Sequence, residues 1–262
     1  MTVALLCTSV NTAVGAAPSL PKPSGSVGLA TDTAVPNVAE HFSFVNQAGN
    51  PVTLARFKGK TIFMVPLLTL CPDTCPFTSG NVRQLQQRVA AAGAGSRVQF
   101  VFFDVDPYRD TPARLRSYAK LVGLTQSDVT FLTLGRAPAP AAGSPTVHHA
   151  DAAYPVENPV ANFFQFQTQK QAEPNPAMVD WMSPYRPLTY DISHSDGFYV
   201  VDPRGVLRFV SGNPPHFVGS LNPTLTAFLS ADGHYVLTHP YTPGWKPSDA
   251  EAALSWVIGK KI

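Results

Sequence analysis

Charged residues are scarce in this sequence. Asp, Glu, Lys and Arg together make up 14% of its 262 residues, against roughly 25% in an average domain. The formal net charge is only +2 and the basic residues are scattered rather than clustered, which argues against a nucleic-acid-binding surface. We therefore expect no nucleic-acid partner. Apolar residues make up 44% of the chain, which is enough for a sizeable core.

A long hydrophobic run is also missing. Residues 2–17 are uncharged, but this stretch is too short to span a membrane and resembles the apolar part of an export signal. No Lys or Arg precedes Lys22, so the basic start of a signal is absent. We interpret residues 1–17 as an export signal or an anchor remnant. This predicts a protein of the periplasm or the extracytoplasmic face of the membrane, with an N-terminal membrane tether as an open alternative.

Cysteine is rare too, with only Cys7, Cys71 and Cys75 in the chain. We interpret Cys7 as a residue discarded with the signal. Lipid attachment at Cys7 is the alternative, although Leu6 is larger than the residue usually found before such a cleavage site. After export, two cysteines would remain in an oxidising compartment, where they can cycle between dithiol and disulfide.

Cys71 and Cys75 lie at an expected junction between a strand and a helix. The apolar run 61–65 precedes them, and a helical pattern follows. If Cys75 lies in the first helical turn, the unpaired backbone N–H groups and the helix dipole favour its thiolate. The spacing places both sulfurs on one side of the turn, where they can share a metal ion or form a disulfide. These residues alone leave both uses open.

The N-terminal third of the chain contains a predicted linker and the start of the folded domain. Residues 18–37 are rich in Pro, Gly, Ser, Ala and Thr without an apolar period, which is typical of a flexible linker. The folded domain is expected to span residues 38–262. It begins with a predicted hairpin between residues 41–45 and 51–54, joined by turn residues.

The centre of the domain follows a strand, helix, strand pattern. The first strand, from residue 61, is expected to end near Val65, because Pro66 cannot donate to a ladder. A helix is predicted over residues 78–92, followed by a buried strand over 98–105. This order implies parallel pairing of the two strands, with both faces of the sheet covered.

Two acidic residues, Asp106 and Asp110, follow the second strand. Thr111 and Pro112 are typical of a helix start, with an N-cap followed by proline in the first turn. We therefore interpret Asp106 and Asp110 as turn-making and capping residues. A pair of catalytic acids is the less favoured alternative, because the spacing alone does not support it.

A strand predicted over residues 130–134 is followed by a long irregular segment. Residues 135–187 are rich in proline, and only residues 160–167 show a regular pattern. We interpret the segment as a loop insertion that forms a lid or a mobile region. It contains His148, His149 and Asp151, which are possible metal ligands by residue type. A solvated loop is favoured, because no further ligand stands at a fixed spacing.

The C-terminal part predicts a hairpin and a final helix. Residues 198–201 and 206–210 are expected to be strands joined by a type I turn from Asp202 to Gly205. The last helix is expected to begin with Ser248 as N-cap and Glu251 completing a capping box. It would cover one face of the sheet.

The chain resembles the Sco (SenC) family of copper-delivery proteins. The resemblance rests on three motifs in the correct order, from roughly Val38 to Ile262, and together they are far more specific than the cysteine spacing alone. The motifs are CPDTCP at residues 71–76, DVDPYRDTP at residues 104–112, and HS at 194–195 before FYVVDPRG at 198–205.

The resemblance implies a fold, a ligand set and a task. The implied fold is α/β and thioredoxin-like, with a central mixed sheet flanked by helices, the added N-terminal hairpin and the 135–187 insertion. The implied copper ligands are Cys71, Cys75 and His194. The implied task is delivery of one copper ion to the binuclear copper centre of cytochrome c oxidase, or to another copper protein, by a monomer. Two thiolates and one imidazole suit Cu(I), and Cu(II) with an added oxygen ligand.

Alternative functions use the same two cysteines. A thiol-disulfide oxidoreductase that reduces the partner's cysteines would use Cys71 and Cys75 as attacking and resolving thiols. A peroxidase and an inert structural disulfide are less favoured. Copper delivery requires His194 and thiol exchange does not, so we expect a binding protein rather than an enzyme.

Overall fold

Three parallel strands form the centre of the molecule. The computed structural model describes residues 20–134, 158–166, 168–173, 175 and 177–262. Strands β4 (Thr61–Leu67), β5 (Val98–Asp104) and β6 (Val129–Thr133) pair in parallel, with β5 in the middle. All residues of β4 and β5 are buried, as expected for strands covered on both faces. The predicted strand, helix, strand unit is confirmed.

Antiparallel strands extend this centre to a mixed sheet of eight strands. The order across the sheet is β1-β12-β11-β4-β5-β6-β2-β3. With α2 joining β4 to β5 and the hairpin β11–β12 beside β4, this is the thioredoxin-like arrangement, so the predicted fold class is confirmed. The added strands are β1 (Leu29–Ala34), β2 (Phe44–Asn46), β3 (Pro51–Val52), β11 (Phe198–Val201) and β12 (Val206–Ser211).

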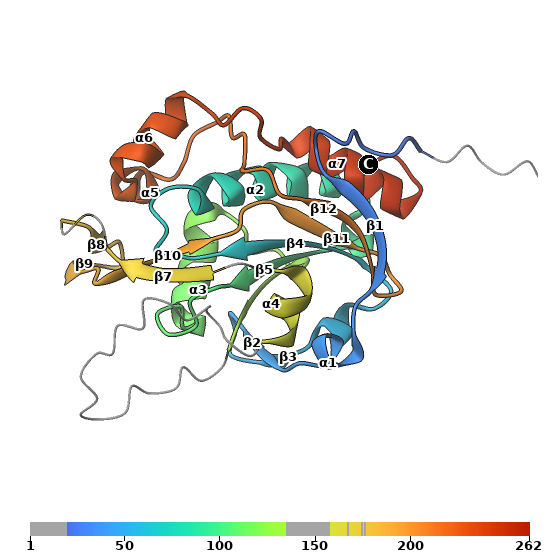
Figure 1. Ribbon diagram of the computed structural model, residues 1–262, viewed down its shortest axis with the longest axis horizontal. Helices are drawn as coiled ribbons and strands as arrows, with labels where there is room; N and C mark the ends of the chain where they lie inside the picture. The colour runs from blue at the N-terminus through green and yellow to red at the C-terminus, as the bar shows by residue number, and fades with distance from the viewer. Residues whose placement is uncertain (1–19, 135–157, 167, 174, 176) are drawn as a thin grey trace, which may run out of the picture.

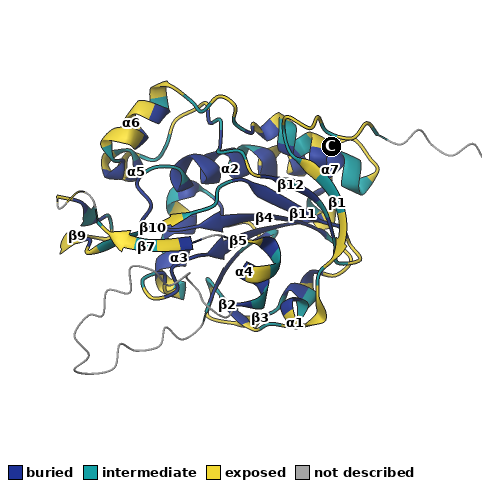
Figure 2. Ribbon diagram, viewed as in Figure 1, coloured by how far each residue is buried: buried dark blue, intermediate teal, exposed yellow. Residues whose placement is uncertain are grey.

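Helices cover both faces of the sheet (Figure 1). Helices α2 (Cys75–Ala91), α3 (Pro112–Val122) and α7 (Pro247–Ile258) lie on one face, where α2 contacts both of the others and the Ser79 and Tyr118 hydroxyls are 3.0 Å apart, and α4 (Pro159–Phe164) lies on the other. The buried residues concentrate on the central strands and the inner faces of these helices (Figure 2). Short helices complete the described fold: α1 (Asn37–Glu40), α5 (Pro223–Phe228), α6 (Ala231–Thr238) and the 3-10 turns Leu54–Phe57 and Gly95–Arg97.

Two small hairpin-like pairs extend from one end of the main sheet (Figure 1). One pairs β7 (Thr168–Ala172) with β10 (Tyr190–His194), and the other pairs β8 (Val179–Asp180) with β9 (Ser183–Pro187). The prediction of an irregular insertion over residues 135–187 is therefore wrong for its second half. These strands are short and mostly polar, and they pair with each other rather than with the buried sheet, so no hydrophobic alternation marks them. His148, His149 and Asp151 lie outside the described residues.

The predicted linker contains a strand of the main sheet. Strand β1 pairs antiparallel with β12, from Leu29 opposite Val210 to Ala34 opposite Val206. The prediction of a flexible linker over residues 18–37 is therefore wrong for residues 29–34. An edge strand is held by backbone hydrogen bonds to its neighbour and needs no apolar pattern in its own sequence. Within the described residues, no helix combines the length and apolar character needed to cross a bilayer.

Strand β4 continues past Pro66, so the prediction that it ends near Val65 is wrong. On one side Pro66 lies opposite Phe103 of β5. On the other side, strand β11 pairs with β4 only as far as Met64. The missing N–H of Pro66 therefore lies where the neighbouring strand has already ended, and no ladder bond is lost.

Two helix starts differ from the predicted ones. Helix α2 begins at Cys75 rather than at residue 78, with Pro76 in its first turn, where proline is tolerated. Helix α7 begins at Pro247, and its N-cap is Lys246, whose backbone N–H donates to the Asp249 carboxylate over 2.8 Å. The predicted capping box of Ser248 and Glu251 is therefore displaced by two residues.

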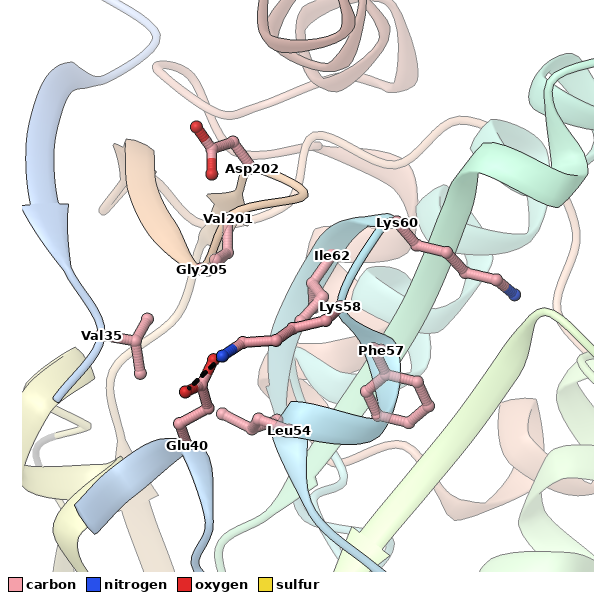
Figure 3. Close-up of a pocket in the computed structure, with 10 residues that line it drawn as sticks. All are labelled: Val35, Glu40, Leu54, Phe57, Lys58, Lys60, Ile62, Val201, Asp202 and Gly205. Carbon is pink, nitrogen blue, oxygen red and sulfur yellow. Dashed lines mark ion pairs between the residues drawn. The ribbon is translucent and has the colours of Figure 1, made fainter. Parts of the chain in front are cut away.

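A small pocket lies at the opposite end of the sheet from the cysteines, where the N-terminal segment meets the β11–β12 turn (Figure 3). The Lys58 amine and the Glu40 carboxylate form an ion pair of 2.9 Å across it. The Val35 N–H donates to the Gly205 carbonyl over 2.8 Å. These contacts anchor the segment between β1 and β2, and we assign them a structural role.

Gly28 tests the docking of β1. A Cβ atom at this position would lie 2.3 Å from the Val210 carbonyl oxygen, whereas one at Gly25 would meet nothing within 4 Å. We expect Gly28→Ala to destabilise the protein by about 1–3 kcal/mol, because backbone must move to accept it, and Gly25→Ala to be nearly neutral. Urea unfolding of both variants measures this. Equal stability of the two variants would contradict the pairing of β1 with β12.

Candidate metal centre

The cysteine loop (residues 68–75) joins the end of β4 to the start of α2. Cys71 lies in the middle of the loop, and its N–H donates to the Leu68 carbonyl over 3.2 Å. Cys75 is the first residue of α2. The loop therefore brings both thiols to one end of a buried strand.

The histidine comes from the other side of β4. His194 is the last residue of β10, and β11 follows after a short connection through Gly197. Gly197 has a φ of +100°, and a Cβ atom there would lie 1.9 Å from the Ser211 carbonyl oxygen. Glycine is therefore required, because a side chain would prevent the close approach that leads the chain from the histidine into β11.

The two cysteines and the histidine meet. Their donor atoms all lie within 4.8 Å of one another, and within the described residues they are the one group of three potential metal ligands at such spacing. The Cys75 Sγ lies 3.3 Å from the His194 Nε2. Both cysteines are free thiols, and Cys71 is 8% exposed while Cys75 is 1% exposed. Both cysteines are therefore buried, and Cys71 is the more exposed of the two.

Hydrogen bonds orient these donors. The His194 Nδ1 lies 3.0 Å from the Ser195 carbonyl oxygen, to which it donates, so Nε2 faces the sulfurs. The Leu68 N–H donates to the Cys75 Sγ over 3.3 Å, and the Thr74 Oγ1 lies 3.8 Å from the Cys71 Sγ. Such second partners fix the orientation of metal ligands.

The two thiols have opposite pKa shifts. Hydrogen bonding from Cys75 lowers the pKa of Cys71 well below its usual value, with a further contribution from the nearby His194. Burial raises the pKa of Cys75. Burial alone would lower the pKa of His194, but hydrogen bonding and the charges of Cys71 and Asp196 raise it to about 9. The metal-free site therefore favours the thiolate at Cys71, the thiol at Cys75 and the imidazolium at His194.

The acidic loop (residues 104–112) lies behind the cysteine loop rather than among the donors. Asp110 is fully buried and accepts hydrogen bonds from the Thr69 N–H, at 2.8 Å, and the Thr69 hydroxyl. Asp106 is also fully buried and forms an ion pair with Arg109. Neither carboxylate contacts the sulfurs, so the structure does not support a catalytic acid pair. Both make tertiary contacts beyond the predicted turn and cap.

Sequence reasoning missed a second wall of the site, formed by the start of α6. The Ser230 N–H donates to the Pro72 carbonyl over 3.1 Å, and the Ser230 hydroxyl donates to Asp73. A Cβ atom at Gly233 would lie 2.4 Å from the Pro72 carbonyl oxygen. Ser230 also caps α6, so its position could have predicted the start of this helix. Nothing in the local sequence indicates that the helix packs against the cysteine loop.

Residues 30–133 match the family model described as SCO1/SenC. The matched segment contains the cysteine loop and the acidic loop. It ends before His194, so the placing of the histidine beside the sulfurs rests on the structure.

Curated relatives match over similar segments. The "SCO1 protein homolog" of Bacillus subtilis is 32% identical over 94 residues, covering 36% of this chain and 48% of the relative. The "Putative copper-binding protein" of Stutzerimonas stutzeri is 31% identical over 102 residues, covering 37% of this chain and 48% of the relative. The matches thus span about half the length of these relatives.

A solved structure is also similar. The structure of Bradyrhizobium japonicum ScoI with copper bound aligns with 76% of this chain and 96% of that chain, at 22% identity and a TM-score of 0.45.

The opposite pKa shifts predict unequal thiol reactivity. We expect iodoacetamide to modify Cys71 much faster than Cys75 at neutral pH, because only the thiolate is a nucleophile. The reactivity of Cys71 should persist well below the usual thiol pKa, since its own pKa is lowered, and His194→Ala should reduce it. Mass spectrometry of the reduced protein over time measures both sites. Faster modification of Cys75 would contradict the assigned charges.

Proposed function

Because the chain belongs to the SCO1/SenC family, as its motifs predicted, we propose that it is a copper-delivery protein. It binds one copper ion through Cys71, Cys75 and His194 and transfers it to the binuclear copper centre of cytochrome c oxidase. The main support is the meeting of three donor atoms within 4.8 Å from segments over a hundred residues apart. Two thiols and an imidazole with purely structural roles would have no need to bring their donor atoms this close together.

The donor set fits copper better than other metals. Two sulfurs and one imidazole are soft donors suited to Cu(I), whereas Zn²⁺ usually takes four protein ligands in a structural site. Cu(II) would be held with an added oxygen. Binding removes a proton from Cys75 and from His194, because both are protonated in the metal-free site and metal ligands must be deprotonated.

The location of the donors favours transfer over storage. The two cysteines follow the end of β4, His194 lies in the strand just before β11, and Cys71 is the more exposed of the two cysteines. A set of three ligands leaves room for a ligand of the acceptor protein to join before the first ones leave. Stepwise exchange of this kind is hindered in a closed four-ligand site.

The proposed partner and location follow from the same family. We propose a copper-accepting subunit of cytochrome c oxidase, or another copper protein, as the partner. The protein acts as a monomer on the extracytoplasmic side of the membrane, reached through the export signal or anchor proposed for residues 1–17. Cell fractionation of the full chain, with protease added to spheroplasts, tests the location.

His194 provides the decisive test of copper binding. In an anaerobic Cu(I) titration against a competing chelator, we expect His194→Ala to weaken binding at least about tenfold, since even loss of an outer partner of a metal ligand costs that much. The Cys71–Cys75 pair should still form its disulfide, with a potential shifted only as far as the lost imidazolium had stabilised the Cys71 thiolate. His41→Ala is the control, because His41 is exposed and far from the sulfurs. Unaltered affinity in His194→Ala would remove the histidine from the site.

Thiol exchange is a second candidate function, favoured by the lowered pKa of Cys71 beside a buried second thiol. The Cys71 thiolate would attack a partner disulfide, form a mixed disulfide and release one partner thiolate. Cys75 would then attack Cys71, forming the Cys71–Cys75 disulfide and releasing the second partner thiol. The protein loses two electrons and the partner gains them.

Trapping distinguishes this second function. We expect Cys75→Ser to accumulate a mixed disulfide at Cys71 with a peptide that carries one intramolecular disulfide, because the resolving thiol is missing. Cys71→Ser should trap little. Non-reducing mass spectrometry measures both. Rapid trapping together with unaltered copper binding in His194→Ala would favour thiol exchange over copper delivery.

A further inference from the structure

We propose that Arg109 is the positioning residue that places His194 beside the two sulfurs. It does not touch the donor atoms. It acts by tying the strand that carries His194 to the acidic loop. The consequence for copper rests on the proposed function, while the consequence for the position of the imidazole does not.

The strand that carries His194 has no backbone ladder to the main sheet, although its Ile192 is buried in the main core. Strand β10 pairs with β7, from Tyr190 opposite Ala172 to His194 opposite Thr168, and within the described residues this pair is separate from the eight-stranded sheet. At its C-terminal end the strand is fixed by the close approach at Gly197. At its N-terminal end the Tyr190 ring contacts two cations, the Lys170 ammonium of β7 at 4.0 Å and the Arg109 guanidinium, and of these two only Arg109 connects the strand to the acidic loop.

Arg109 provides this tie at Tyr190, the first residue of the strand. The Arg109 Nη1 donates to the Tyr190 carbonyl over 2.6 Å, and the guanidinium lies 3.7 Å from the centre of the Tyr190 ring. The Arg109 Nε donates to Asp106, whose other oxygen accepts from the Tyr190 hydroxyl over 3.1 Å. The side chains of Arg109 and Asp106 are 11% and 0% exposed. Arg109, Asp106 and Tyr190 thus contact one another, and these buried contacts connect the acidic loop to β10.

The planar guanidinium is well suited to this role. It donates in two directions at once and stacks on an aromatic ring, which an ammonium group cannot do in the same geometry. Charge-assisted hydrogen bonds of this kind are stronger than neutral ones. We therefore expect the Arg109 contacts to limit the movement of β10 more than the Tyr190 hydroxyl alone.

The same loop holds the cysteines through a different residue. Asp110 binds the N–H and hydroxyl of Thr69, two residues before Cys71, and the Trp181 Nε1 donates to the Thr69 carbonyl over 2.8 Å. One short segment therefore positions both halves of the site, with Asp110 on the sulfur side and Arg109 on the imidazole side. Thr69→Val perturbs the sulfur side alone and serves as a comparison.

The position of the imidazole is tested in the metal-free, reduced protein. NMR should show a cross-relaxation signal between the His194 ring protons and the Cys75 β protons in the wild type. We expect Arg109→Gln to remove or strongly weaken this signal and Arg109→Lys to retain part of it. The control is Arg116→Gln, which changes an exposed arginine of the nearby helix α3 and should leave the signal unchanged. A full signal in Arg109→Gln would overturn the inference.

Copper binding gives the second readout. We expect Arg109→Gln to weaken Cu(I) binding about tenfold, as for other outer partners of metal ligands. X-ray absorption spectroscopy of the copper-loaded variant should still show two sulfur ligands, but a lower number of nitrogen ligands. Thr69→Val should not lower the nitrogen count, because it leaves the histidine strand intact.

A double-mutant comparison separates positioning from general destabilisation. In the His194→Ala background, Arg109→Gln should cause no further loss of affinity, because the arginine acts through the missing imidazole. An equal loss in both backgrounds would contradict positioning through His194. If His194→Ala alone leaves copper affinity unchanged, the proposed function fails, and the NMR result still decides whether Arg109 places the imidazole. If Arg109→Gln does not fold, Arg109→Lys decides in the same assays.

Discussion

The parallel ladder between β4 and β5 is the constraint on which the site depends. Leu67 and Asp104, the last residues of the two strands, lie opposite each other, and the Val105 N–H donates to the Leu67 carbonyl over 2.9 Å. Both strands therefore end at the same level. The cysteine loop and the acidic loop must leave the sheet side by side, which brings Thr69 within reach of Asp110.

The histidine reaches the same place because β11 is antiparallel to β4. Tyr199, near the start of β11, lies opposite Met64, near the end of β4. The connection before β11 therefore lies next to the loop after β4. The cysteine loop is enclosed between the acidic loop on the β5 side and the histidine on the β11 side.

Buried charge gives this region a single arrangement. Burial raises the pKa of Asp110 to about 6, while the hydrogen bonds from Thr69 act in the opposite direction. Arg114 holds Asp180 of β8 through two hydrogen bonds, and both side chains are nearly buried. Removing one partner of such a network leaves an unpaired polar group, which is costly. We infer that the network contributes more to the precise geometry of the site than to overall stability.

Local patterns of residues are enough to predict the central strands, the main helices and the chemistry of the donors. Apolar runs and the cysteine spacing are local patterns, and the three motifs carried the fold and named Cys71, Cys75 and His194. The same patterns miss the continuation of β4 past Pro66 and the strand β1 within residues 18–37, because backbone pairing with a distant segment leaves no periodic pattern in the local sequence. Folding fixes what these patterns leave open: the separation of the donors, the opposite pKa shifts of the thiols and the place of Arg109. These depend on the register between segments far apart in the chain, and on burial, which no single stretch of residues records.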